Sequence, residues 1–146
     1  MPADRGGAPT GFPAGSPTGF PPGRTWRRKF ADAFRGLARA VRTQSSFAVH
    51  LPVAGLVVLL AALFRLPARD WAVLLVAIGG VLAAELFNSA LEAFARAPGQ
   101  GRHPRIRDAL DIASAAVLVA AATAVGVGLV VFLPRLVELV RAAERG

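Results

Sequence analysis

Apolar residues fall in long continuous runs along this chain instead of alternating with polar ones. Residues 47–64 form one run, residues 71–95 a second and residues 109–133 a third. Each run is close to the ~20 residues that a helix needs to cross a bilayer. A helix on the surface of a soluble core needs a polar face, which these runs lack for most of their length. The pattern predicts an all-α membrane protein with three transmembrane helices.

The first of these runs contains two residues that are unusual in a membrane helix, His50 and Pro52. Both lie in the first turns of the expected helix, where proline is tolerated. A polar side chain there can be satisfied by the membrane interface or by a bound headgroup. We therefore predict that residues 47–64 span the membrane, with His50 satisfied by the interface or by a bound headgroup.

The segment before the first run has helical spacing with two distinct faces. Over residues 26–43, an apolar face opposes a basic face; the apolar face consists of Trp26, Phe30, Phe34, Leu37 and Val41. This pattern predicts an N-terminal amphipathic helix that lies on the membrane surface. Residues 1–24, by contrast, are rich in Gly and Pro, and we expect them to form a disordered tail.

The chain has a net charge of +8, but its basic residues flank the apolar runs, so we expect no nucleic-acid partner. Lys and Arg are most frequent before the first run and between the second and third runs. The positive-inside rule places these segments in the cytoplasm. The N-terminus is therefore expected in the cytoplasm and the C-terminus outside, with residues 135–146 as a periplasmic tail.

The second run ends in a group of polar residues that calls for an explanation. Glu85, Asn88 and Glu92 stand at offsets of 0, 3 and 7, so a helix presents all three on one face. A carboxylate at the bilayer centre costs about 2.5 to 3.5 kcal/mol on insertion scales. Either this face forms a functional site, or the membrane helix ends near Ala84 and the carboxylates lie among headgroups.

Further candidate residues follow in the second loop and at the start of the third run. The loop is basic, and Asp111 shares a helical face with Ser114. Carboxylates can hold Mg²⁺ against nucleotide phosphates, cations can neutralise a transferred phosphoryl group, and one carboxylate can accept a proton from a hydroxyl. The set is typical of phosphoryl transfer to a lipid alcohol, although the basic loop is also explained by membrane topology alone.

Two motifs resemble those of the bacterial diacylglycerol kinase and undecaprenol kinase family. They are Glu85-Leu-Phe-Asn-Ser-Ala-Leu-Glu92 and, about 20 residues further on, Asp111-Ile-Ala-Ser-Ala-Ala-Val-Leu118. The resemblance covers roughly residues 30–133. It implies a homotrimeric lipid kinase of the bacterial inner membrane that uses ATP and Mg²⁺.

The resemblance also implies roles for individual residues. It makes Glu85 the general base and Asn88 its polar neighbour, and it assigns Mg²⁺ to Glu92 and Gln44. The implied nucleotide-binding residues are Glu92, His103, Arg107 and Asp111, and the implied lipid-binding residues are Phe34, Leu37, Val41 and Phe47.

Three residues depart from the family pattern. Gln44 replaces a second metal-binding Glu, Arg96 replaces an Asp, and Leu110 replaces a Lys. We expect weaker metal binding as a result, with Arg107 or another loop Arg compensating for the missing Lys. The alternative is a non-catalytic lipid-binding or structural membrane protein that retains the kinase fold. The sequence does not choose between diacylglycerol and undecaprenol.

Overall fold

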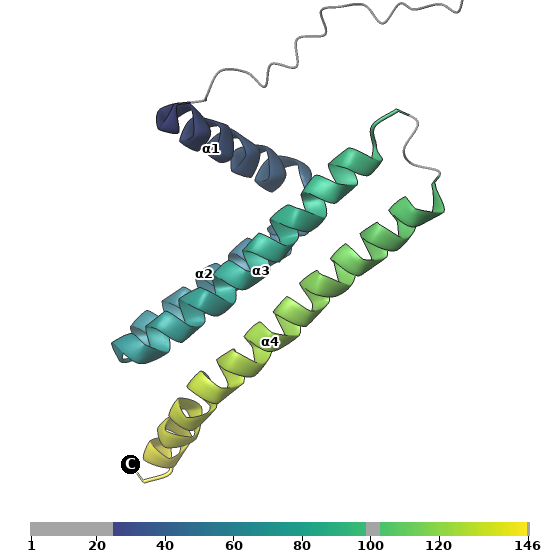
Figure 1. Cartoon of the computed structure of the whole chain (residues 1–146). Helices are drawn as coiled ribbons and strands as arrows, with labels where there is room; N and C mark the ends of the chain where they lie inside the picture. Colours follow the sequence, from purple (N-terminus) through teal and green to yellow (C-terminus); the bar gives the residue numbers. More distant parts are fainter. Residues whose placement is uncertain (1–24, 99–102, 146) are drawn as a thin grey trace, which may run out of the picture.

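The computed structural model describes residues 25–98 and 103–145, and all regular structure within these ranges is helical. The helices are α1 (Trp26–Thr43), α2 (Phe47–Leu63), α3 (Ala68–Ala95) and α4 (Pro104–Ala143). Figure 1 shows α2, α3 and α4 running side by side, while α1 leaves one end of this bundle at a steep angle. The expected disordered tail, residues 1–24, lies outside the described residues.

A sharp corner separates α1 from α2. The two helices are bent by 104° relative to each other. Gln44 forms the corner with an extended backbone conformation (φ −108°, ψ 122°), which no α-helix can continue. Its N–H donates to the carbonyl of Ala40 in α1 over 3.0 Å, and its carbonyl accepts from the N–H of Phe47 in α2 over 3.3 Å. Gln44 is therefore fixed to both helices.

The turn between α2 and α3 is closed by a Schellman motif. Arg65 adopts a left-handed conformation with φ 50°. The N–H of Leu66 donates to the carbonyl of Ala61, and the N–H of Arg65 donates to that of Ala62. Ala61, Leu66 and Leu74 form a buried cluster there. This cluster joins α2 to α3 at the end of the bundle opposite α1.

Helix α4 begins earlier and ends later than the apolar run that predicted it. His103 caps its N-terminus through Nδ1, which accepts the N–H of Arg105 at 3.3 Å, and Pro104 follows at the first helical position. The helix continues through Pro134 to Ala143 instead of ending near residue 133. No residue of α4 is buried.

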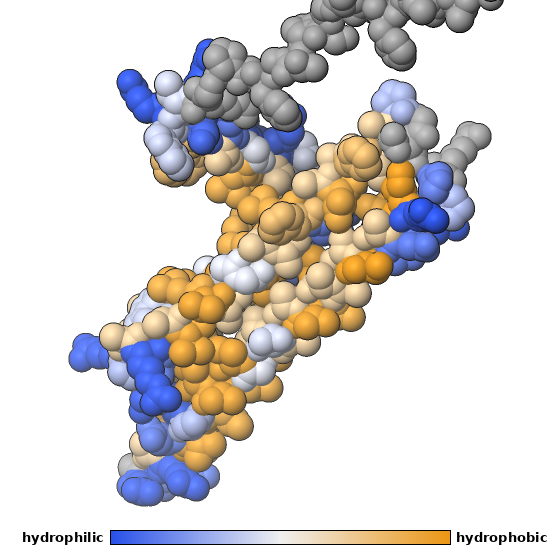
Figure 2. Space-filling view, in the orientation of Figure 1, coloured by the Kyte–Doolittle hydropathy of each residue, from blue (hydrophilic) through white to orange (hydrophobic). Residues whose placement is uncertain are grey.

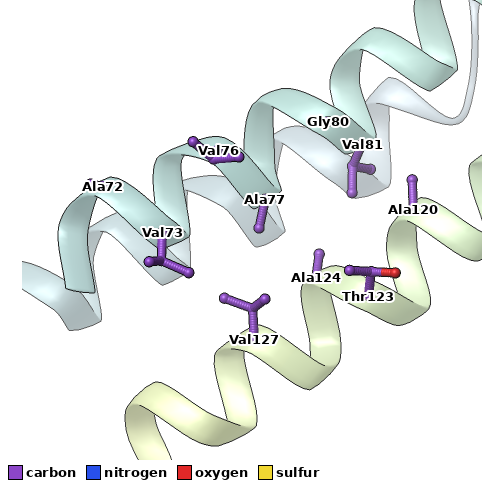
Figure 3. A pocket seen from close by; sticks show the side chains of 10 residues that line it. All are labelled: Ala72, Val73, Val76, Ala77, Gly80, Val81, Ala120, Thr123, Ala124 and Val127. Carbon is purple, nitrogen blue, oxygen red and sulfur yellow. The ribbon is translucent and has the colours of Figure 1, made fainter. Parts of the chain in front are cut away.

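The contact between α3 and α4 contains a groove of about 450 Å³ lined by small residues. In Figure 3, Ala77, Gly80 and Val81 of α3 face Ala120 and Ala124 of α4. The side-chain oxygen visible in this view belongs to Thr123, and it donates to the carbonyl of Val119 at 2.9 Å. The groove therefore offers apolar surface but no polar group that needs a ligand.

Two of the helices in the described ranges, α3 and α4, are long and apolar enough to cross a membrane. The number rises to three if the bent pair α1 and α2 counts as one span. Helix α2 alone has 17 residues, at the lower limit for a spanning helix. Figure 2 shows polar residues gathered at the two ends of the bundle with an apolar region between them. The apolar helices agree with a membrane protein, and the third span stays a prediction.

The buried cluster provides a test of the packing between α2 and α3. Ala61 is 0% exposed, whereas its neighbour Ala62 is exposed. We expect Ala61→Leu to overpack this cluster and to destabilise the protein by about 1 to 3 kcal/mol. Ala62→Leu adds the same atoms on an open face and should leave stability unchanged. Thermal unfolding in detergent, followed by circular dichroism, measures the difference, and equal melting temperatures would contradict the packing.

Candidate active site where α1, α2 and α3 meet

The polar face at the end of α3 is turned inward, towards the corner between α1 and α2. Glu85, Asn88 and Ser89 are buried, and Glu85 is only 4% exposed. Glu92, one turn further, is partly exposed. Helix α3 continues without interruption to Ala95. The carboxylates therefore lie within one continuous helix and face inward, while their depth in the membrane stays a prediction.

Glu92 collects three side-chain donors. The amide nitrogen of Gln44 donates to Oε2 at 3.2 Å, that of Asn88 donates to Oε1 at 3.1 Å, and Arg96 donates to Oε2 at 3.4 Å. Gln44 comes from the α1–α2 corner, 48 residues away in sequence. Asn88, expected as the neighbour of Glu85, thus directs its amide nitrogen to Glu92 instead.

Glu85 has a different partner, His50 in the first turns of α2. The distance from Nε2 of His50 to Oε1 of Glu85 is 3.2 Å. An ionised carboxylate can only accept hydrogen bonds, so the imidazole is the donor in this contact when Glu85 is charged. His50, for which we expected the interface or a bound headgroup as partner, thus meets a buried carboxylate of α3.

Two buried side-chain oxygens in the described ranges have no hydrogen-bond partner: Oε2 of Glu85 and Oδ1 of Asn88. Leaving such a group without a partner costs about 1 to 3 kcal/mol. Unpaired buried acceptors at one site are typical of positions that a ligand completes. Glu85 thus has one oxygen bound to His50 and one that is buried without a partner.

This set of donors fits a magnesium ion. Mg²⁺ is usually held by one or two carboxylates together with substrate phosphates and water. Glu92 supplies the carboxylate, Asn88 has an unpaired oxygen, and Gln44 can present its amide oxygen by a half-turn of the amide group. In the described residues no three His, Cys, Asp or Glu side chains converge as a metal site, so a bound ion would depend on these amides and on phosphate oxygens.

The expected nucleotide-binding residues of α4 stand apart from this cluster. His103, Arg107 and Asp111 are exposed. Within the described ranges, no hydrogen bond or ion pair links them to Glu85 or Glu92, and the ring of His103 caps its own helix. Their roles therefore remain predictions.

The expected lipid-binding residues divide into two groups. Phe34, Leu37 and Val41 on α1 are exposed, with Phe34 at 69%. Phe47, in contrast, is 1% exposed, so it has no surface to offer a lipid. We reassign Phe47 to internal packing next to the corner.

An apolar cavity of about 370 Å³ lies between α2, α3 and α4. Among the described residues that line it, His50 is the polar one. Because His50 also contacts Glu85, the cavity meets the polar face of α3 at this residue. A second cavity of similar volume lies between α1 and α3 and includes Gln44, Ser89 and Arg96. The polar face is thus flanked by two largely apolar cavities, and the one between α1 and α3 also has several polar lining residues.

Sequence reasoning did not assign a role to His50. The signal was present, since His50 is the one ionisable residue in the apolar run 47–64, and such residues in membrane helices are functional candidates with a partner to be found. The partner lies 35 residues away, and nothing in the linear pattern connects the two positions.

The structure thus places a buried carboxylate with an unpaired oxygen, two amides and an arginine at one end of an apolar helical bundle, as in a membrane protein with a polar site between its helices. A family model described as prokaryotic diacylglycerol kinase matches residues 31–132. The chain belongs to this family, which is one of lipid kinases, and this result favours the enzyme over the non-catalytic alternative.

Individual relatives agree with the family. The undecaprenol kinase of Bacillus subtilis (strain 168) is 33% identical over 109 residues, which is 75% of this chain and 89% of that protein. The diacylglycerol kinase of Synechocystis sp. is 38% identical over 111 residues, again 75% of this chain but 63% of that protein. No solved structure gives a significant match.

Proposed function

We propose that this protein transfers the γ-phosphoryl group of ATP to the hydroxyl of a membrane lipid alcohol, diacylglycerol or undecaprenol, at the cytoplasmic face of the membrane. The observation that carries the proposal is the state of Glu85. This carboxylate is buried, its Oε1 is held by His50, and its Oε2 has no partner. Such a group is suited to accept one proton from a substrate that enters the site.

In the proposed reaction Glu85 acts as general base. The O–H bond of the lipid breaks and its proton passes to Oε2 of Glu85. The lipid oxygen forms a bond to the γ-phosphorus of ATP, and the bond between that phosphorus and the bridging oxygen of ADP breaks. Asn88, one turn along α3, offers its unpaired Oδ1 to the polar groups of the bound substrates.

Glu92 and Gln44 would hold nucleotide-bound Mg²⁺, which neutralises charge on the phosphates when it is bound. In this structure Glu92 forms an ion pair with Arg96. The pair is partly exposed and joins residues i and i+4 of one helix. Such pairs are worth only about 0.3 to 0.5 kcal/mol. Arg96 can therefore leave Glu92 at little cost and turn to the phosphates.

The nucleotide site is completed, in this proposal, by His103, Arg107 and Asp111 of α4 within a homotrimer. Helix α4 has no buried residue in a single copy of the chain, so its surface is available to another subunit. A site shared between subunits accounts for the separation of these residues from Glu92. Cross-linking in detergent should yield trimers, and a fully active monomer would exclude a shared site.

The apolar cavity beside His50 suits the hydrocarbon part of the lipid, with the hydroxyl directed to Glu85. The exposed apolar residues of α1, including Phe34 and Leu37, suit contact with the surrounding lipid layer. Helix α1 would then lie in the membrane interface with its basic residues towards the headgroups.

We further propose that the N-terminus is cytoplasmic and the C-terminus external, on the basis of the Lys and Arg distribution. A reporter enzyme active only in the periplasm, fused after Gly146, should therefore be active. The same reporter fused before α1 should be inactive and serves as the matched control. Activity in the reverse order would place Glu92 on the wrong side of the membrane for cytoplasmic ATP.

The proposed reaction is tested by phosphate transfer from radiolabelled ATP to lipid, using purified protein in detergent micelles. Diacylglycerol and undecaprenol are supplied separately, and triacylglycerol, which has no free hydroxyl, is the matched control. We expect a Mg²⁺-dependent phosphorylated product with at least one of the two alcohols and none with triacylglycerol. No product above that of heat-inactivated protein, with either alcohol, would refute the proposed function.

A further inference from the structure

The contact between His50 and Glu85 joins two helices at the most buried carboxylate of the site. Nε2 of His50 lies 3.2 Å from Oε1 of Glu85, and the side chains are 22% and 5% exposed. His50 stands in the first turn of α2, after the α1–α2 corner, and Glu85 stands in the second half of α3. Each residue is thus held by a different helix, and their bond fixes the distance between the two at this point.

The bond also determines which oxygen of Glu85 is available. A glutamate side chain has three rotatable torsions, and an unrestrained carboxylate exposes either oxygen in several directions. With Oε1 bound to the imidazole, Oε2 is the oxygen without a partner. A general base must be within hydrogen-bond reach of the proton it removes, so an orientation fixed before the substrate binds favours the reaction.

His50 has a second contact region, the apolar cavity between α2, α3 and α4. His50 thus contacts both the apolar cavity and Glu85. A hydroxyl that approached Glu85 from this cavity would therefore find His50 beside the base.

We propose that His50 is a positioning residue for Glu85: its Nε2–H holds Oε1 so that Oε2 faces the lipid hydroxyl. The proposal rests on the proposed function, since it assigns Glu85 the role of base. His50 itself keeps its proton throughout, and the proton of the hydroxyl ends on Oε2 of Glu85. The residue acts through Glu85 and not on the transferred group.

The first test compares two replacements of His50 in lipid phosphorylation assays. Gln can present an amide N–H at nearly the same reach as Nε2, whereas Leu has similar bulk and no donor. We expect His50→Leu to lower kcat by about tenfold or more with KM for ATP unchanged, the scale of one hydrogen bond to a charged group. His50→Gln should retain most of kcat. Equal losses in both variants, or no loss in His50→Leu, would overturn the positioning role.

The second test does not depend on activity. The sequence contains two histidines, His50 and His103, so a protein with ¹⁵N-labelled histidine rings gives few signals, and the His50→Gln spectrum assigns them. We expect Glu85→Gln to shift the Nε2 resonance of His50 and to leave that of His103 in place. An unchanged His50 resonance would overturn the contact.

The two tests separate this inference from the proposed function. If the wild-type protein phosphorylates neither alcohol while the His50 resonance responds to Glu85→Gln, the contact stands and the kinase proposal fails, together with the positioning role. If the wild-type protein is active and His50→Leu retains its kcat, the positioning role alone fails.

Discussion

Replacing Glu85 with Gln should lower the rate of lipid phosphorylation by about 10² or more, the usual scale for loss of a general base. Gln keeps the size of the side chain and can still accept a hydrogen bond from His50 through its amide oxygen. The amide nitrogen that replaces Oε2 cannot take a proton from the lipid hydroxyl. The loss should appear in the turnover number, measured at saturating ATP and lipid.

The matched control for this experiment is Glu138→Gln. Glu138 is exposed near the far end of α4, where its partner is Arg135 at 3.6 Å, and the same change of charge there should leave turnover unaltered. Nucleotide binding and the Mg²⁺ dependence of Glu85→Gln should also match the wild type. If Glu85→Gln turns over normally, another residue is the base and Glu85 has only a structural role.

Replacing Glu92 with Gln should weaken Mg²⁺ binding instead of proton transfer. The side-chain amides of Gln44 and Asn88 both donate to Glu92. Loss of groups that merely support a metal ligand costs about 10-fold to 100-fold in affinity, and loss of a ligand should cost at least as much. We expect the Mg²⁺ concentration for half-maximal activity to rise by about 100-fold, with partial recovery of turnover at high Mg²⁺.

Glu144→Gln, in the exposed C-terminal turn, is the control for this change. Glu85→Gln and Glu92→Gln should be distinguishable in a Mg²⁺ titration. Glu85→Gln lowers turnover at every Mg²⁺ concentration, whereas Glu92→Gln shifts the Mg²⁺ concentration needed for activity. An unshifted titration in Glu92→Gln would place the metal elsewhere, and Asp111 would be the next carboxylate to replace.

The parts of the fold that sequence predicted well are those with local causes. The position of α1 follows from apolar residues spaced along one face, and the shared face of Glu85, Asn88 and Glu92 follows from helical geometry alone. The late end of α4 was not predictable in the same way. Its last turns are polar enough to resemble a tail, but the continuing helix carries them past Pro134.

The pairing of side chains across helices could not be predicted from the linear pattern. Periodicity shows which face of a helix is polar but not which neighbour that face meets. Thus the hydrogen bond between His50 and Glu85 and the reach of Gln44 to Glu92 depend on how α2 and the corner are placed against α3. The burial of Phe47 depends on the same placement.

The corner at Gln44 would have a mechanical consequence with α1 on the lipid surface, as we propose. Helix α1 has 18 residues, so it forms a lever about 27 Å long, and a tilt of about 10° moves its Trp26 end by about 5 Å. Gln44 sits at the pivot of this lever, tied to α1 and α2 through its own backbone. Undulations of the lipid layer that tilted α1 would then move Gln44, and its amide beside Glu92, least.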